Sequence, residues 1–129
     1  MTPPDPIDGA KHFFRPMLPL EIGFGEKTVW VDALVDSGAD CNMAPLELAE
    51  YFNISLDKYP KKIFFGIDPN SPVETYVVPV HLKFGGHKID SIMCFGGSPA
   101  CPLLGQKGFF DKVKRIDFQY PKYCEIKKN

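Results

Sequence analysis

The spacing of apolar and polar residues predicts a chain built mainly from short strands. Between residues 17 and 35, apolar side chains recur at every second position in two runs, which a glycine-containing turn at residues 23–26 separates. Alternation with a period of two is typical of strands that bury one face. We therefore predict a hairpin here, with Asp36 at the end of its second strand.

A second hairpin is predicted further along the chain. Residues 63–65 and 73–84 carry many apolar side chains, and residues 66–72 between them are of types that favour a tight reversal. A Gly-Gly pair at residues 85–86 then turns the chain into another strand over residues 89–95. Together these segments predict a projecting hairpin followed by a further strand.

The long strand over residues 73–84 contains one proline. Pro79 has no amide hydrogen to donate to a neighbouring strand, which indicates an edge position. The alternation of side chains along this strand turns His81 away from the apolar face, so we expect His81 to be exposed to solvent.

Two short helices are also predicted. Pro45 suits the start of a helix over residues 46–52. We expect a second short helix at residues 106–113, before a last pair of strands around residues 116–118 and 124–126. The whole pattern predicts a mostly β fold.

Length and proline content indicate the domain organisation. The 129 residues suit one domain with a single core. Prolines at four of the first sixteen positions leave little periodicity there. We therefore expect an extended N-terminal arm over residues 1–16 and a single domain over residues 17–129.

The charge balance argues against a polyanionic partner. Fifteen Lys plus Arg and sixteen Asp plus Glu leave a net charge of −1, too small to recruit nucleic acid or an anionic membrane. No apolar run approaches the ~18 residues of a membrane span, and the proline-rich, acidic start lacks the order of a secretory signal. We expect a cytoplasmic protein without nucleic-acid or membrane partners.

The cysteines are predicted to be reduced thiols that pack as small apolar side chains. A chain of this length without a secretory signal does not need disulfides to fold. The sequence has no Cys-x-x-Cys pair, and its three histidines do not follow the spacing of a zinc site. We therefore expect no metal and no other cofactor. The four cysteines are Cys41, Cys94, Cys101 and Cys124.

One segment carries residues suited to catalysis. Residues 33–40 read Ala-Leu-Val-Asp-Ser-Gly-Ala-Asp, an apolar strand that leads directly into a carboxylate, a hydroxyl and a glycine. Gly38 lets the backbone turn sharply next to Asp36, and the Ser37 hydroxyl can fix the turn by hydrogen bonding. Asp-Ser-Gly is also an ordinary turn sequence, so the triplet is informative only in its context.

That context resembles the retropepsin family, the retroviral aspartic proteases with their cellular and prokaryotic relatives. The resemblance rests on the Asp-Ser-Gly motif, the predicted hairpin turn at residues 66–72 and Pro-Leu-Leu-Gly at residues 102–105, and it spans about residues 17–126. It implies a small closed β-barrel with a flap hairpin and a short C-terminal helix, as in the stand-alone prokaryotic members. It also implies an endopeptidase that cleaves extended polypeptides.

The resemblance assigns roles to individual residues. Asp36 is expected to be catalytic, with Ser37 and Gly38 bracing the active-site loop. An arginine that commonly follows the family's glycine is replaced by Gln106, which predicts a weaker dimer, and Asp-Pro-Asn-Ser at residues 68–71 predicts a stiffer flap tip. The residues expected to contact substrate are Ala39, Asp40, Gly66, Ile67, Asp68 and Leu104.

One catalytic aspartate per chain implies a homodimer. Peptide hydrolysis without a metal or a covalent intermediate needs one group that takes a proton from water and another that gives a proton to the carbonyl oxygen. Two facing carboxylates can do both, because like-charge repulsion makes them share a proton. The sequence has one Asp-Ser/Thr-Gly segment, and a two-fold axis would bring Asp36 of each copy together.

Two other interpretations remain open. The same fold could hold extended peptides without cleaving them, as a binding or assembly module. The replacement by Gln106 and the stiff flap tip both favour this hypothesis. A cysteine peptidase would instead need Cys41 or Cys101 to approach His81 or His87, although neither cysteine neighbours a histidine in the sequence.

Overall fold

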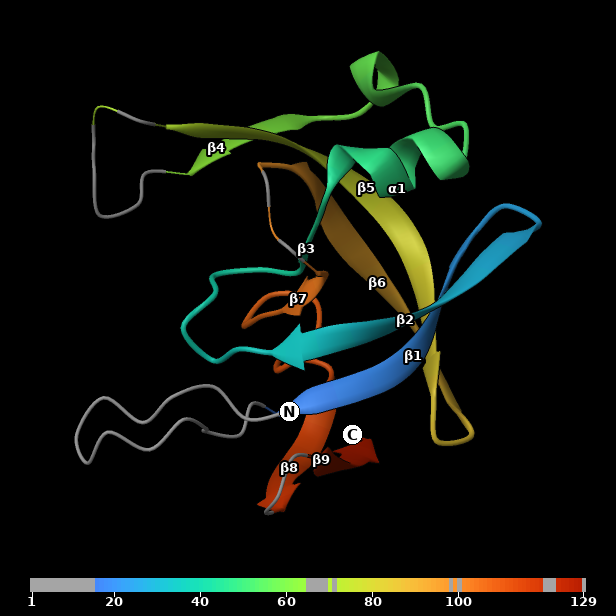
Figure 1. Ribbon diagram of the computed structural model, residues 1–129, viewed down its shortest axis with the longest axis vertical. Helices are drawn as coiled ribbons and strands as arrows, with labels where there is room; N and C mark the ends of the chain where they lie inside the picture. Colours follow the sequence, from blue (N-terminus) through green and yellow to red (C-terminus); the bar gives the residue numbers. More distant parts are fainter. Residues whose placement is uncertain are drawn as a thin grey trace, which may run out of the picture.

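Strands account for most of the elements. The computed structural model describes residues 16–64, 70, 72–97, 99, 101–119 and 123–128, and within them it confirms the mostly β prediction (Figure 1). The predicted N-terminal arm, apart from Pro16, and most of the predicted flap tip lie outside the described residues. In chain order the elements are β1 (Met17–Phe24), β2 (Lys27–Val35), β3 (Met43–Ala44), α1 (Leu46–Tyr51), the 3₁₀ helix η1 (Leu56–Lys58), β4 (Lys61–Phe64), β5 (Val73–Phe84), β6 (His87–Gly96), β7 (Leu103–Leu104), β8 (Val113–Gln119) and β9 (Tyr123–Lys128).

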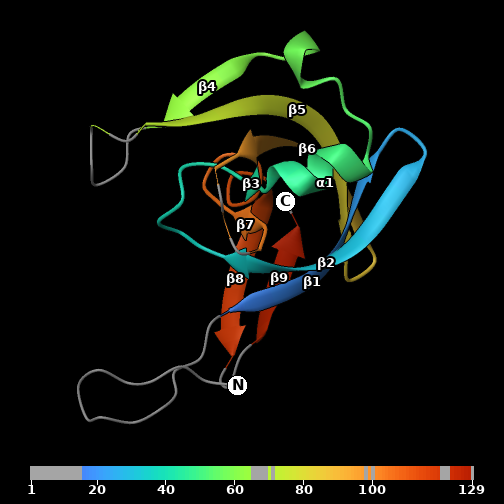
Figure 2. The same ribbon diagram turned by 45° about the horizontal axis from the view of Figure 1, so that its top comes forward.

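Six of these strands close into a barrel. They pair in the order β5-β6-β3-β7-β2-β1, and β1 then pairs back to β5, with Ile22 opposite Leu82. The hairpins β1–β2 and β5–β6 are antiparallel, whereas β2 pairs with β7 and β3 pairs with β6 in parallel (Figures 1 and 2). Closure pairs both sides of the strands and leaves few exposed edges. The predicted closed β-barrel is confirmed.

Alternate side chains of β1 and β5 fill the barrel. Leu20 and Ile22 on β1 are fully buried, and so is Leu82 on β5. The ring of Phe84 lies 5.7 Å from the ring of Phe109, between centroids, so the segment after β7 packs against the end of β5. The period-two prediction is therefore confirmed for both strands, and His81 is exposed as expected.

Strand β5 is not an edge strand, contrary to the prediction from Pro79. It pairs with β6 along one side and with β4 and β1 along the other. The hydrogen bonds between β5 and the β4 segment end at Val77, whose amide donates to the Pro60 carbonyl at 2.8 Å. The pairing of β5 with β1 begins at His81. Alternate amides of a strand point the same way, so residue 79 faces the gap between these two partners. The proline marks a local gap in pairing.

The helix predicted at residues 106–113 is a series of turns. Amides of Phe110 and Asp111 donate to carbonyls five residues back, at 3.0 and 3.1 Å, which is not the α-helical pattern. Gly108 has φ of +103°, which a glycine tolerates and a regular helix does not contain. The hairpin of β8 and β9 follows, at the end of the molecule away from β4 (Figure 1). The first predicted helix is present as α1.

Candidate active site

The end of strand β2 fixes where Asp36 lies. The Leu34 amide donates to the Pro102 carbonyl at 2.8 Å, and the Asp36 amide donates to the Leu104 carbonyl at 2.9 Å. These bonds belong to the parallel pairing of β2 with β7. Asp36 therefore leaves the barrel wall in a defined direction and begins the loop 36–42.

The carboxylate of Asp36 takes part in the turn that follows it. The Gly38 amide donates to Asp36 Oδ1 at 2.9 Å, and the Ala39 amide donates to the Asp36 carbonyl at 3.1 Å. A Cβ atom on residue 38 would lie 3.2 Å from the same carboxylate oxygen, so a glycine suits this close approach. Asp36 is half-buried and Ser37 and Gly38 are exposed, which leaves the carboxylate accessible from outside the chain.

Gln106 braces this loop from the other side. Its side-chain Nε2 donates to the Ser37 carbonyl at 2.8 Å, and its backbone amide donates to the Ala39 carbonyl at 2.9 Å. The next amide, of Lys107, donates to the Asp40 carbonyl at 2.9 Å. The residue that replaces the expected arginine thus supports the loop within its own chain, which the sequence analysis did not predict.

At Gly105 the segment after β7 comes very close to the backbone of the loop 36–42. A Cβ atom on residue 105 would lie 2.6 Å from the Cys41 carbonyl oxygen and 2.7 Å from the Ala39 carbonyl oxygen. Both are backbone atoms, so any larger residue would push the two segments apart. The glycine of the Pro-Leu-Leu-Gly segment therefore has a steric reason to be there.

Asn42, which the sequence analysis missed, joins three segments beneath the loop. Its side chain is fully buried. Asn42 Oδ1 accepts the Gly105 amide at 3.0 Å, while Nδ2 donates to the Ile92 carbonyl at 3.0 Å and to Ser91 Oγ at 3.3 Å. The Ser91 hydroxyl in turn donates to the Gly108 carbonyl. One amide side chain thereby links the loop to β6 and to the segment after β7.

The backbone amide and carbonyl of Asn42 are also hydrogen-bonded. Its amide donates to the Lys107 carbonyl at 3.1 Å, and its carbonyl accepts the Cys94 amide at 2.9 Å. Among the described residues, no buried side-chain nitrogen or oxygen lacks a partner. The only sequence signal for this junction is an amide between the apolar neighbours Cys41 and Met43, and it does not reveal the partners.

The structure brings the predicted site residues 36–40 together in one loop. Leu104 lies directly beneath the loop, where its side chain is fully buried in the core and its carbonyl holds the Asp36 amide. In this conformation the Leu104 side chain offers no surface to a substrate, so its visible contribution is to position Asp36. The predicted flap residues Gly66, Ile67 and Asp68 lie outside the described residues.

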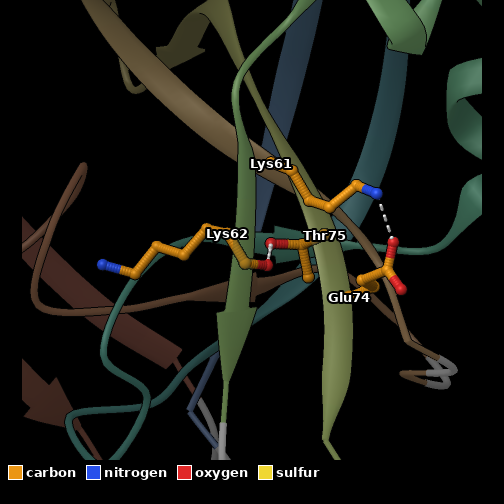
Figure 3. A network of polar contacts seen from close by, with 4 residues as sticks. All are labelled: Lys61, Lys62, Glu74 and Thr75. Carbon is orange, nitrogen blue, oxygen red and sulfur yellow. Dashed lines mark hydrogen bonds and ion pairs between the residues drawn. The ribbon is translucent and has the colours of Figure 1, made fainter.

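The two arms that lead to the predicted flap are paired up to their ends. In β4 and β5 the register places Phe64 opposite Val73. Polar contacts join the arms, because Lys61 Nζ lies 2.8 Å from Glu74 Oε1 and the Thr75 hydroxyl donates to the Lys62 carbonyl at 2.9 Å (Figure 3). The arms extend on the same side of the molecule as the loop after β2 (Figures 1 and 2).

The histidines do not pair with the cysteines that a cysteine peptidase would use. His81 Nδ1 lies 2.7 Å from Asp90 Oδ1, and His87 packs against the ring of Phe84 at 6.1 Å between centroids. Cys41 instead has its sulfur 2.8 Å from that of Cys94. Within the described part of the chain, no three potential metal ligands gather, and no helix has both the length and the apolarity to cross a bilayer.

Comparison with known proteins identifies similar structures. No protein-family model matches the chain, and no curated protein matches it. EIAV protease in complex with an inhibitor superposes with a TM-score of 0.54 at 23% sequence identity, over 70% of this chain and 81% of that chain. A retropepsin-like aspartic protease from Rickettsia conorii superposes with a TM-score of 0.60 at 16% identity, over 80% of this chain and 84% of that chain.

Proposed function

We propose that this chain, which has the fold of the retropepsin-like aspartic proteases, is an aspartic endopeptidase that works as a homodimer. The observation that carries the proposal is the position of Asp36 at the end of β2. There the Gly38 amide holds one carboxylate oxygen, and Gln106 braces the loop. A two-fold axis through the dimer would bring two such carboxylates face to face.

In the proposed dimer the two Asp36 carboxylates divide the acid and base roles. The ionised carboxylate takes a proton from a water molecule, which attacks the peptide carbonyl carbon. The protonated partner donates its proton to the carbonyl oxygen. Like-charge repulsion between the facing groups keeps one proton on the pair, so both forms are present at once. The resulting diol breaks down as a proton reaches the leaving nitrogen.

The proposed substrate is an extended polypeptide held between the loop 36–42 and the hairpin of β4 and β5. Asp40 is exposed on this loop, and its carboxylate can accept hydrogen bonds from peptide amides. Ala39 beside it, and Gly66, Ile67 and Asp68 in the flap, complete the proposed contacts. We place this activity in the cytoplasm. We propose neither nucleic acid nor a membrane as a partner, because a net charge of −1 attracts neither.

The replacement of Asp36 by Asn tests the proposal. Asn keeps an oxygen that accepts the Gly38 amide, so we expect Asp36→Asn to fold while it loses acid–base chemistry. The value of kcat/KM for an unstructured peptide, followed by mass spectrometry, should fall at least about a hundredfold. The matched control is Asp32→Asn, because Asp32 is an exposed carboxylate on β2, the strand that leads to Asp36. Sedimentation should show the same dimer for the wild type and both variants.

Two outcomes would contradict this function. One is a purified Asp36→Asn variant that cleaves the peptide with the same kcat/KM as the wild type. The other is cleavage by a chain that sedimentation shows to be a monomer at the concentration of the assay. Peptide binding without turnover from acid to neutral pH would instead support a binding or assembly module. The bond from Gln106 to the Ser37 carbonyl bears on one of the two reasons for that alternative, because it shows that the loop is supported without the expected arginine. The other reason, the stiff flap tip, stays a prediction.

A further inference from the structure

Two buried cysteines meet at the base of the loop that carries Asp36. The Sγ atoms of Cys41 and Cys94 lie 2.8 Å apart although the residues are 53 positions apart in the chain. Both thiols are free, with 4% and 1% of their surface exposed. Their separation is about 0.8 Å longer than the S–S bond of about 2.05 Å. A small movement of either side chain would therefore bring the sulfurs to bonding distance.

The backbone holds the two cysteines in this position. Strands β3 and β6 pair in parallel with Met43 opposite Cys94, and the Cys94 amide donates to the Asn42 carbonyl at 2.9 Å. Cys41 lies two residues before Met43, so its side chain reaches Cys94 diagonally across this pair. On its other side Cys41 forms a parallel bridge with Lys107. The sulfurs therefore meet because the barrel closes, and not by chance contact of mobile loops.

The surroundings make the two thiols unequal. The hydrogen bond with Cys41 lowers the pKa of Cys94, with smaller contributions in the same direction from Thr75, Lys62 and Lys107, although burial opposes them. Thr75 and Lys62 belong to the paired arms of β5 and β4 (Figure 3). The same hydrogen bond, together with burial, raises the pKa of Cys41. Cys94 is therefore the thiol of the pair that ionises more readily, and a thiolate beside a thiol is the combination from which disulfides form.

We propose that Cys41 and Cys94 are an oxidisable dithiol that closes reversibly into a disulfide and ties the Asp36 loop to strand β6. With hydrogen peroxide as the oxidant, the Cys94 sulfur attacks one peroxide oxygen and becomes a sulfenic acid, with release of water. The Cys41 sulfur then displaces the hydroxyl as a second water, and the S–S bond forms. Two thiols lose two electrons and two protons, and one peroxide becomes two waters.

The cross-link has two physical consequences. It closes a long loop in the unfolded chain and so lowers the entropy of the unfolded state, which should raise Tm by about 5 °C or more. It also fixes Cys41, the neighbour of Asp40, to the barrel wall. A dithiol reductant reverses the step by thiol–disulfide exchange. The proposal does not depend on whether the chain cleaves peptides.

The test uses the full chain with Cys101→Ser and Cys124→Ser, which leaves only the proposed pair. After one equivalent of hydrogen peroxide, the protein is denatured in iodoacetamide and its mass is measured. We expect a loss of the mass of two hydrogen atoms, no alkylation and a peptide containing Cys41 linked to one containing Cys94. Dithiothreitol should restore two alkylatable thiols. The same linked peptide is expected from the oxidised wild type. The wild type therefore still tests the proposal if the double variant does not fold.

Cys94→Ser in the wild-type background is the matched control. It leaves Cys41 without its partner, so the link to residue 94 and the rise in Tm on oxidation should both disappear. Two alkylated thiols at residues 41 and 94 after oxidation would overturn the proposal. So would sulfinic acids at these residues without a linked peptide, or a disulfide that joins other cysteines in the wild type.

Discussion

In strand β5 the side chains that hold the structure are apolar, whereas in the loop 36–42 the contacts that do so are polar. Alternate residues of β5 are buried in the core, where the removal of apolar surface from water stabilises them. The loop is held by the Asn42 amide and by backbone bonds to residues 104–107. Apolar packing tolerates side chains of similar size, but a hydrogen-bond junction depends on particular atoms. The wall of the barrel and its loop should therefore respond differently to substitution.

The largest expected effect on stability is in the barrel wall, at strand β5. Leu82→Ala removes a fully buried side chain from β5, and the cavity should lower the free energy of unfolding by about 3 kcal/mol. Urea denaturation of the two proteins measures the difference. Ile63→Ala is the control, because Ile63 is 47% exposed on β4 and its truncation should cost under about 1 kcal/mol. Equal losses from the two variants would contradict the assigned core.

A smaller loss of stability, but a more local one, is expected at the junction. Asn42→Ala leaves the buried Gly105 amide without its acceptor and removes the shorter of the two hydrogen bonds to the Ile92 carbonyl, which should cost about 2 kcal/mol. Hydrogen exchange of the Gly105 amide should accelerate by more than that of the β5 amides. Asn53→Gly is the control, since Asn53 is exposed with φ of 56° and glycine tolerates this conformation. Uniform acceleration along the chain would argue against a local junction.

The smallest effect on stability is expected at Gln106, whose side chain braces the loop 36–42. Gln106→Glu keeps the length of the side chain but replaces the group that donates to the Ser37 carbonyl with an acceptor. Because Gln106 is exposed, Tm should fall by only about 2 °C, as expected for roughly half a kcal/mol. The amides of Gly38 and Ala39 should nevertheless exchange faster than in the wild type. Unchanged exchange at both amides would show that the loop does not need Gln106.

The same contrast explains which features could be predicted from the sequence. Alternation along β1, β2 and β5 is a local signal, so the hairpins, the position of Asp36 and the exposure of His81 were accessible to it. The contacts of Asn42 with Gly105 and of Gln106 with Ser37 join residues 63 and 69 positions apart, and no periodicity records them. The sequence likewise could not show that Pro79 faces a gap between two partner strands.

The helix expected at residues 106–113 failed for a related reason. Its composition permits a helix, but Gly108 adopts a positive φ and its amide donates to Asp111 Oδ1 at 2.9 Å. The surrounding segments determine this conformation, since a Cβ atom on residue 108 would lie 2.6 Å from Asn42 Nδ2. Local propensity was overridden by a contact with a distant residue.

The distance along the chain between Asp36 and its support has a consequence during protein synthesis. Asp36 is translated before its support, because Gln106, which braces Ser37, is made 69 residues after that serine. Contacts between such distant segments form only after the intervening chain has been translated. A nascent chain therefore carries the acidic residue through the synthesis of these intervening residues without a formed loop around it. The order of the sequence delays assembly of the loop until residues 104–107 have emerged.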